Sequence, residues 1–111
     1  MLSELMKPWL ILLVAAAFEV GWAIGLKYTQ GFTRLWPSVA TGAAMATSMY
    51  LLAVAARVLP IGTAYAVWTG LGAAGTAVAG MVLLGEPAGA ARLGCIAMIV
   101  AGVAGLRVFS A

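Results

Sequence analysis

Glu19 is the residue in this sequence whose chemistry stands out, because it is a carboxylate within a long apolar run. The nearest charge along the chain is Lys27, eight residues further on, so no adjacent ion pair offsets it. A carboxylate at the centre of a bilayer costs about 2.5–3.5 kcal/mol on insertion scales, and removal from water disfavours its charged form. We therefore expect Glu19 to exchange a proton at physiological pH and to bind a cation when it is ionised.

Aromatic and polar residues at helical spacing could complete a cation site around this carboxylate. Trp22 lies three residues after Glu19 on the same helix face, and the π-face of an indole attracts cations. Tyr65 and Trp68 have the same spacing, and their N–H and O–H groups need acceptors in a dry setting. Ser48 is a further polar group at depth. More ordinary roles stay open: an interfacial position for Tyr65, packing for Trp22, and a bond within its own helix for Ser48.

Small residues mark two further features. Gly70 and Gly72 follow the second aromatic pair, and helical glycines favour bending, so they are candidates for a hinge in alternating access. Ala97, Ala101 and Gly105 recur every four residues, a stripe that suits helix pairing in membranes. Such stripes are common, so this one indicates a dimer contact only weakly.

Four apolar runs must position these residues. Of the 111 residues, 65% are hydrophobic and 8% charged, against about 25% charged in soluble domains. Crossing a bilayer core of about 30 Å takes about 20 helical residues. The four prolines each fall at or just before the start of a run. We expect one all-α integral membrane domain over residues 1–111, with transmembrane helices at about 9–27, 37–57, 61–84 and 89–108.

The basic residues predict how the chain inserts. Alternating spans place three on each side of the membrane: Lys7, Arg57 and Arg107 on one, and Lys27, Arg34 and Arg92 on the other. Orientation normally follows an excess of Lys and Arg on the cytoplasmic side. With no excess, we expect insertion either way up and pairing of opposite copies as an antiparallel, dual-topology homodimer. Because the basic residues are scattered singly, we expect no nucleic-acid partner.

The sequence lacks the residues that several classes of function need. The sequence has no His and a single Cys, Cys95, so we expect no metal site, and no nucleophile–base pair indicates an enzyme. We expect no cofactor. The first apolar run is too short before its small residues for a cleaved signal peptide, so we interpret it as a retained helix.

Three segments resemble the small multidrug resistance family of proton-coupled cation exporters. They are residues 18–29, 31–38 and 60–70, and the similarity extends over essentially the whole chain. The resemblance implies an antiparallel homodimer in the bacterial inner membrane, with Glu19 of both subunits lining one shared site. It further implies Trp22, Ser48, Tyr65 and Trp68 around that site, a bend near Gly70–Gly72, and the last helix as the main dimer contact.

Within the family, the guanidinium exporter branch is most similar, because Trp22 follows the glutamate and Leu26 to Thr29 read Leu-Lys-Tyr-Thr. The implied activity is a proton-coupled antiport that exports guanidinium and small substituted guanidinium cations. A guanidinium fork matches a carboxylate bidentately, and we expect Ser48 and Trp68 to orient Glu19 as hydrogen-bond donors.

Three alternatives remain. The first is a multidrug exporter of quaternary ammonium or aromatic cations. The second is a rotor-ring proteolipid, which has two helices and carries its acid in the later one. The third is a scaffold protein, which would not need a carboxylate at membrane depth.

Overall fold

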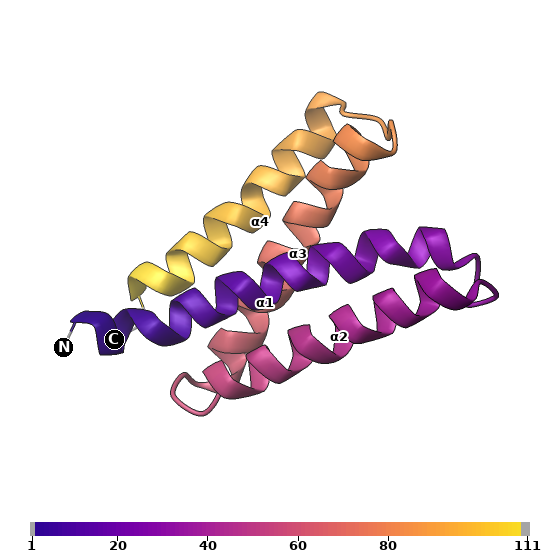
Figure 1. Ribbon diagram of the computed structural model, residues 1–111. Coiled ribbons are helices and arrows are strands. Elements are labelled where there is room, and N and C mark those ends of the chain that lie inside the picture. Colours follow the sequence, from indigo (N-terminus) through magenta and orange to yellow (C-terminus); the bar gives the residue numbers. More distant parts are fainter. Residues whose placement is uncertain (1, 110–111) are drawn as a thin grey trace.

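The computed structural model describes residues 2–109, with side chains for residues 6–109, and it consists of four long helices (Figure 1). The helices are α1 (Leu2–Thr29), α2 (Leu35–Ala55), α3 (Ile61–Leu83) and α4 (Ala90–Phe109). Each is long and apolar enough to cross a membrane. The predicted all-α, four-span architecture is therefore confirmed.

Helix α1 begins earlier than the apolar run indicates. It starts at Leu2 rather than near residue 9, and Pro8 lies inside it. Residues 2–7 include Leu, Glu, Met and Lys, which are good helix formers, so the helix extends beyond the proline despite the hydrogen bond that Pro8 cannot donate. The remaining helix ends lie within two residues of the expected positions.

The helices form an open layer rather than a closed bundle. Helix α1 packs against both α2 and α3, whereas α4 packs against α3. The molecule accordingly measures 45 × 35 × 20 Å along its principal axes. The beginning of α1, the α2–α3 connection and the end of α4 lie at one end of the layer, and the other two connections lie at the opposite end (Figure 1). This arrangement agrees with the alternating spans expected from the sequence.

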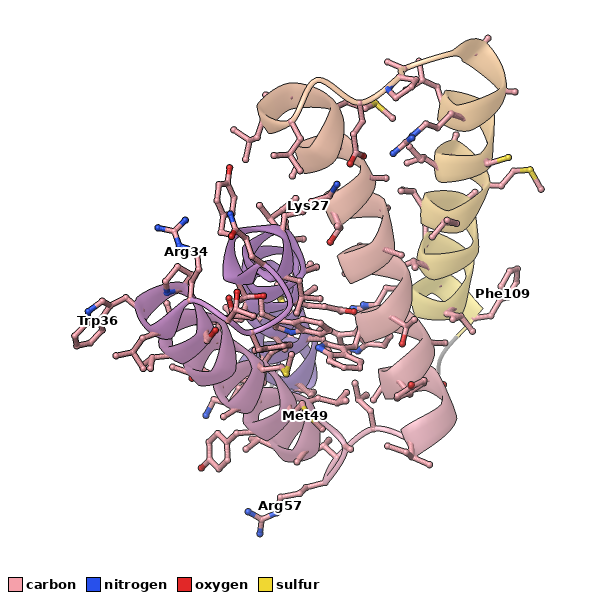
Figure 2. All side chains as sticks on the ribbon, turned by 90° about the vertical axis from the view of Figure 1, so that its right-hand side faces the viewer. Lys27, Arg34, Trp36, Met49, Arg57 and Phe109 are labelled. Atoms are coloured by element: carbon pink, nitrogen blue, oxygen red, sulfur yellow. The ribbon has the colours of Figure 1, made fainter. Side chains whose placement is uncertain are left out.

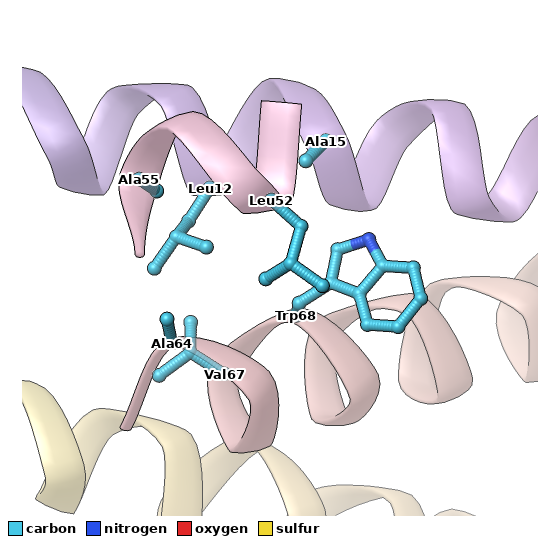
Figure 3. Packing of buried hydrophobic residues seen from close by; sticks show 7 residues of the cluster. All are labelled: Leu12, Ala15, Leu52, Ala55, Ala64, Val67 and Trp68. Carbon is cyan, nitrogen blue, oxygen red and sulfur yellow. The ribbon is translucent and has the colours of Figure 1, made fainter. Parts of the chain in front are cut away.

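A small core joins α1, α2 and α3. Side chains from the three helices point toward one another in Figure 3, which shows Leu12, Ala15, Leu52, Ala55, Ala64, Val67 and Trp68. In contrast, α4 contributes no buried residue over Ala90–Phe109. One whole side of this helix is therefore left open in the single chain.

The connection after α1 is a tight turn. Gln30, Gly31 and Phe32 all adopt left-handed backbone conformations, with φ of 50°, 72° and 64°. The Thr29 hydroxyl donates to the Leu26 carbonyl (2.8 Å) and accepts the Phe32 N–H (3.2 Å), which caps the last turn of α1. This cap fixes the end of the helix that carries Glu19 and Lys27.

Candidate functional site

A cleft of about 410 Å³ runs between α1 and α3, and Glu19 lies in its wall. On α1 it extends from Glu19 to Lys27, and on α3 and its C-cap residue from Gly72 to Leu84. Its far end is formed by Glu86 and Arg92 of the α3–α4 connection and the first turn of α4. The cleft therefore leads from near the middle of the candidate membrane span of α1 to one end of the helical layer.

The Glu19 carboxylate lies directly against the backbone of α3. A methyl group on Gly72 would overlap the carboxylate, so a larger residue here would force the Glu19 side chain to move. The Glu19 Oε1 atom is buried and has no hydrogen-bond partner among the residues that the structure describes. Buried polar atoms are rarely left unpaired, and an unpaired acceptor in a cleft is the position at which a ligand donor would bind.

A chain of hydrogen bonds crosses three helices beside this carboxylate. Trp68 Nε1 of α3 donates to the Ser48 Oγ of α2 (2.9 Å), and the Ser48 hydroxyl donates to the Ala15 carbonyl of α1 (2.7 Å). In an α-helix this carbonyl also accepts the N–H of the residue four positions later, which is Glu19. Ser48 and Trp68 thus hold the helix turn that carries Glu19.

The expectation that Ser48 and Trp68 donate to the Glu19 carboxylate is not met in the single chain. Ser48 faces α1 one turn before the glutamate, so its hydroxyl reaches a backbone carbonyl instead. The Trp68 indole N–H is then satisfied by the serine oxygen. The carboxylate stays free to accept hydrogen bonds from another group.

The two remaining aromatic residues lie apart from the cleft. Trp22 packs against the core, and its Nε1 is buried without a partner in the described part of the chain. Tyr65 is half exposed, and its ring centroid lies 5.6 Å from that of Trp68 with an interplanar angle of 51°. The structure therefore places Ser48, Tyr65 and Trp68 in one group, and Ser48 contacts the turn of α1 that carries Glu19.

The two candidate hinge glycines have different neighbours. Gly72 faces Glu19, whereas Gly70 faces the Val103 side chain of α4. Helix α3 runs unbroken from Ile61 to Leu83 through both positions. In this conformation the two glycines allow close packing, and their role as a hinge stays a prediction.

The small-residue stripe lies on the open side of α4. Ala97 and Ala101 are exposed and Gly105 is half buried. Ile99 and Val103 of the same helix instead face Gly70 of α3. The stripe is therefore available to a further helix.

Three charged residues of the cleft were missed in the sequence. Lys27, Glu86 and Arg92 all line the cleft that contains Glu19, although the sequence pattern assigns none of them to the site. Arg92 Nη2 lies 3.0 Å from Glu86 Oε1 in an ion pair. The sequence contains a signal for the ion pair, since an acid and a base lie six residues apart across one short connection, but none for its place in the cleft.

Four helices able to span a membrane, with a buried carboxylate oxygen in a cleft between α1 and α3, define a small integral membrane transport protein. The chain belongs to the Small Multidrug Resistance protein family, whose model matches residues 7–99. It is therefore a multi-pass protein of the bacterial inner membrane with a transporter role.

Similar proteins of known name agree with this membership. The chain is 60% identical over 99 residues to the guanidinium exporters of Citrobacter freundii and of Escherichia coli, covering 89% of this chain and 94% of each relative. It is 58% identical over 102 residues to the guanidinium exporter of Yersinia pestis, covering 92% of this chain and 98% of that protein.

Proposed function

We propose that this protein is a proton-coupled antiporter that exports guanidinium and small substituted guanidinium cations. The observation that carries the proposal is the Glu19 Oε1 atom, which is buried in the cleft without a hydrogen-bond partner in the described chain. Relatives named guanidinium exporters, at 58–60% identity over most of the chain, support the choice of substrate.

The chemistry of exchange follows from competition for one carboxylate. Ionised Glu19 can accept two parallel N–H bonds from a planar guanidinium ion. Once protonated, the same group has lost its charge and cannot form that pair. Proton and substrate therefore exclude each other, and raising the pH should strengthen guanidinium binding. If the protein changes its open side only when it carries one or the other, proton entry drives guanidinium export.

The neighbouring residues have proposed roles in holding the site. The bonds through Ser48 and Trp68 fix the turn of α1 that carries Glu19, which limits the positions that its carboxylate can reach. The unpaired indole N–H of Trp22 and the ring of Tyr65 complete the surroundings of the cation after assembly or conformational change.

The working unit in this proposal is an antiparallel homodimer. The basic residues divide three to three between the two sides, so the chain has no preferred orientation. Helix α4 has no buried residue over Ala90–Phe109 and presents the stripe of Ala97, Ala101 and Gly105. Pairing through this stripe would cover α4 and bring Glu19 of both copies to one shared site.

Transport by the purified protein in proteoliposomes tests the function. With a pH gradient imposed, guanidinium and methylguanidinium should each drive proton flux, whereas tetraethylammonium and a large planar aromatic cation should not. Preference for the bulky cations would instead support the multidrug alternative. No flux with any cation would leave the scaffold alternative and contradict transport.

A further inference from the structure

We propose that Glu86 is a second cation-binding carboxylate, at the mouth of the Glu19 cleft, and that the Arg92 side chain occupies it until a guanidinium ion displaces it. The inference rests on the proposed function and deepens it. It assigns a binding role to the ion pair between Glu86 of the α3–α4 connection and Arg92 of α4, which lies apart from Glu19.

Both carboxylates lie along one face of α3. Gly72, Thr76 and Gly80 are spaced one turn apart and all line the cleft. The Glu19 carboxylate lies against Gly72, and the Glu86 carboxylate lies against Gly80, where a methyl group would overlap it. Eight residues at 1.5 Å each separate the two glycines, so the two acids stand about 12 Å apart along the helix. A cation that enters from this end meets Glu86 first.

The Glu86 carboxylate is held in place and is partly open to water. Its backbone N–H donates to the Gly80 carbonyl (3.2 Å), which folds the connection back against α3. Its Oε1 accepts from Arg92 Nη2 (3.0 Å), and the two side chains are 33% and 38% exposed. Partly exposed ion pairs are weak, so another cation can replace this one.

The present occupant of Glu86 has the chemistry of the proposed substrate. Arg92 ends in a guanidinium group, and a free guanidinium ion presents the same planar N–H donors to a carboxylate. A tethered competitor prevents Glu86 from retaining the ion, because Arg92 can return when the ion moves on. The pair therefore offers a transient position rather than a tight site.

The charges around the mouth give Glu86 a second effect. Lys27 of α1 and Arg92 both line this end of the cleft, and Glu86 is the acid beside them. Without Glu86, Lys27 and Arg92 would present two positive charges to an incoming cation. With Glu86 present, the net charge at this end of the cleft is one positive charge. Charged groups that line a cleft change association rates strongly at low ionic strength. Glu86 should therefore speed entry and exit without setting affinity at Glu19.

Equilibrium binding to variants that carry Glu19→Gln measures guanidinium binding at Glu86 without the contribution of Glu19. Radiolabelled guanidinium is dialysed against three detergent-purified proteins at low ionic strength: E19Q, E19Q/R92Q and E19Q/E86Q/R92Q. We expect weak binding of one ion to E19Q, tighter binding to E19Q/R92Q because Arg92 no longer competes for Glu86, and no binding to E19Q/E86Q/R92Q. E19Q/R34Q is the charge-matched control, since Arg34 is exposed and projects away from α3 and α4 (Figure 2). Absence of binding to E19Q/R92Q, or equal binding to the triple variant, overturns the assignment.

Transport by the Glu86→Gln variant is a second, independent test of the role of Glu86. At low salt and subsaturating guanidinium, we expect flux to fall on the order of threefold to tenfold, and less at high salt. Equilibrium binding at Glu19 should stay within about twofold of the unmodified protein, since the deep carboxylate is unchanged. Flux like that of the unmodified protein at low salt contradicts the proposal. The proposed function is judged separately, by whether the unmodified protein moves guanidinium at all.

Discussion

Ser48 connects three helices through one hydroxyl group. It accepts the Trp68 indole N–H and donates to the Ala15 carbonyl, so the turn of α1 that carries Glu19 is tied to both α2 and α3. Its neighbour Thr47 is exposed and donates to the Ala43 carbonyl of its own helix (2.9 Å). The two hydroxyl groups are adjacent in sequence, but that of Ser48 joins different helices whereas that of Thr47 bonds only within α2.

Removal of these hydroxyl groups should have unequal effects. Ser48→Ala leaves the buried Trp68 N–H unpaired, which costs about 1–3 kcal/mol, and should weaken guanidinium binding because the turn carrying Glu19 is released. Thr47→Val should leave both stability and binding unchanged. Denaturation in detergent and guanidinium titration measure the two quantities. Equal effects of the two substitutions would show that the bonds between helices do not support the site.

Substitution of Gly72 can show whether this glycine serves for close packing against Glu19 or as a hinge in α3. The methyl group of Gly72→Ala would overlap the Glu19 carboxylate, so we expect equilibrium guanidinium binding to weaken by about tenfold or more, equivalent to about 1.4 kcal/mol. Gly62→Ala is the control on the same helix, because a methyl group there meets nothing within 4 Å. Isothermal titration measures both.

A different result for Gly72→Ala would support the hinge. If binding is retained while transport is lost, the glycine acts through bending of α3 and its contact with Glu19 has no influence on the substrate. A hinge and a contact can coexist, and in that case both binding and turnover fall.

At the level of helices, α4 is the element that the single chain leaves least supported. It packs mainly on α3, with Arg107 over the Trp9 ring of α1, and its small stripe faces away from Gly70 of α3. Small residues let helix backbones approach closely in membranes, where packing rather than hydrophobicity drives association. In the proposed dimer, the open side of α4 is the contact for the second copy.

A larger side chain on this stripe should weaken the dimer. We expect Ala101→Leu to shift the population toward monomers and to reduce transport in proportion, because the backbones can no longer approach. Cys95→Leu adds a leucine at an exposed position off the stripe and should change neither property. Energy transfer between labelled copies in liposomes measures pairing. Unchanged pairing in Ala101→Leu would place the dimer contact elsewhere.

The sequence was sufficient for the helices and insufficient for their mutual positions. Apolar runs bounded by prolines predicted four spans, and a lone acid in the first predicted Glu19 as the reactive group. That Glu86 and Arg92 would line the same cleft depends on how α1 packs on α3, which no local pattern records. The partner of Ser48 was unpredictable for the same reason, since a shift of one turn exchanges a carboxylate for a backbone carbonyl.

At the level of the whole molecule, the balance of basic residues should decide orientation. Leu35 and Val58 are exposed at opposite ends of the helical layer. Leu35→Lys and Val58→Lys should each bias insertion in one direction, in opposite senses. Topology reporters at the C-terminus measure the bias.

Co-expression then tests the antiparallel pairing. Each lysine variant alone should lose most guanidinium export, because partners of opposite orientation become scarce, and the two variants together should regain it. Full export by either variant alone would contradict an antiparallel working unit.

In the proposed mechanism one carboxylate, Glu19, binds either a proton or guanidinium. Guanidinium added to the purified protein in weakly buffered detergent solution, at a pH where Glu19 is partly protonated, should release protons into the medium. Glu19→Gln should release none, and binding to the unmodified protein should tighten as the pH is raised. Proton release that persists in Glu19→Gln, or guanidinium binding that does not depend on pH, would contradict the account.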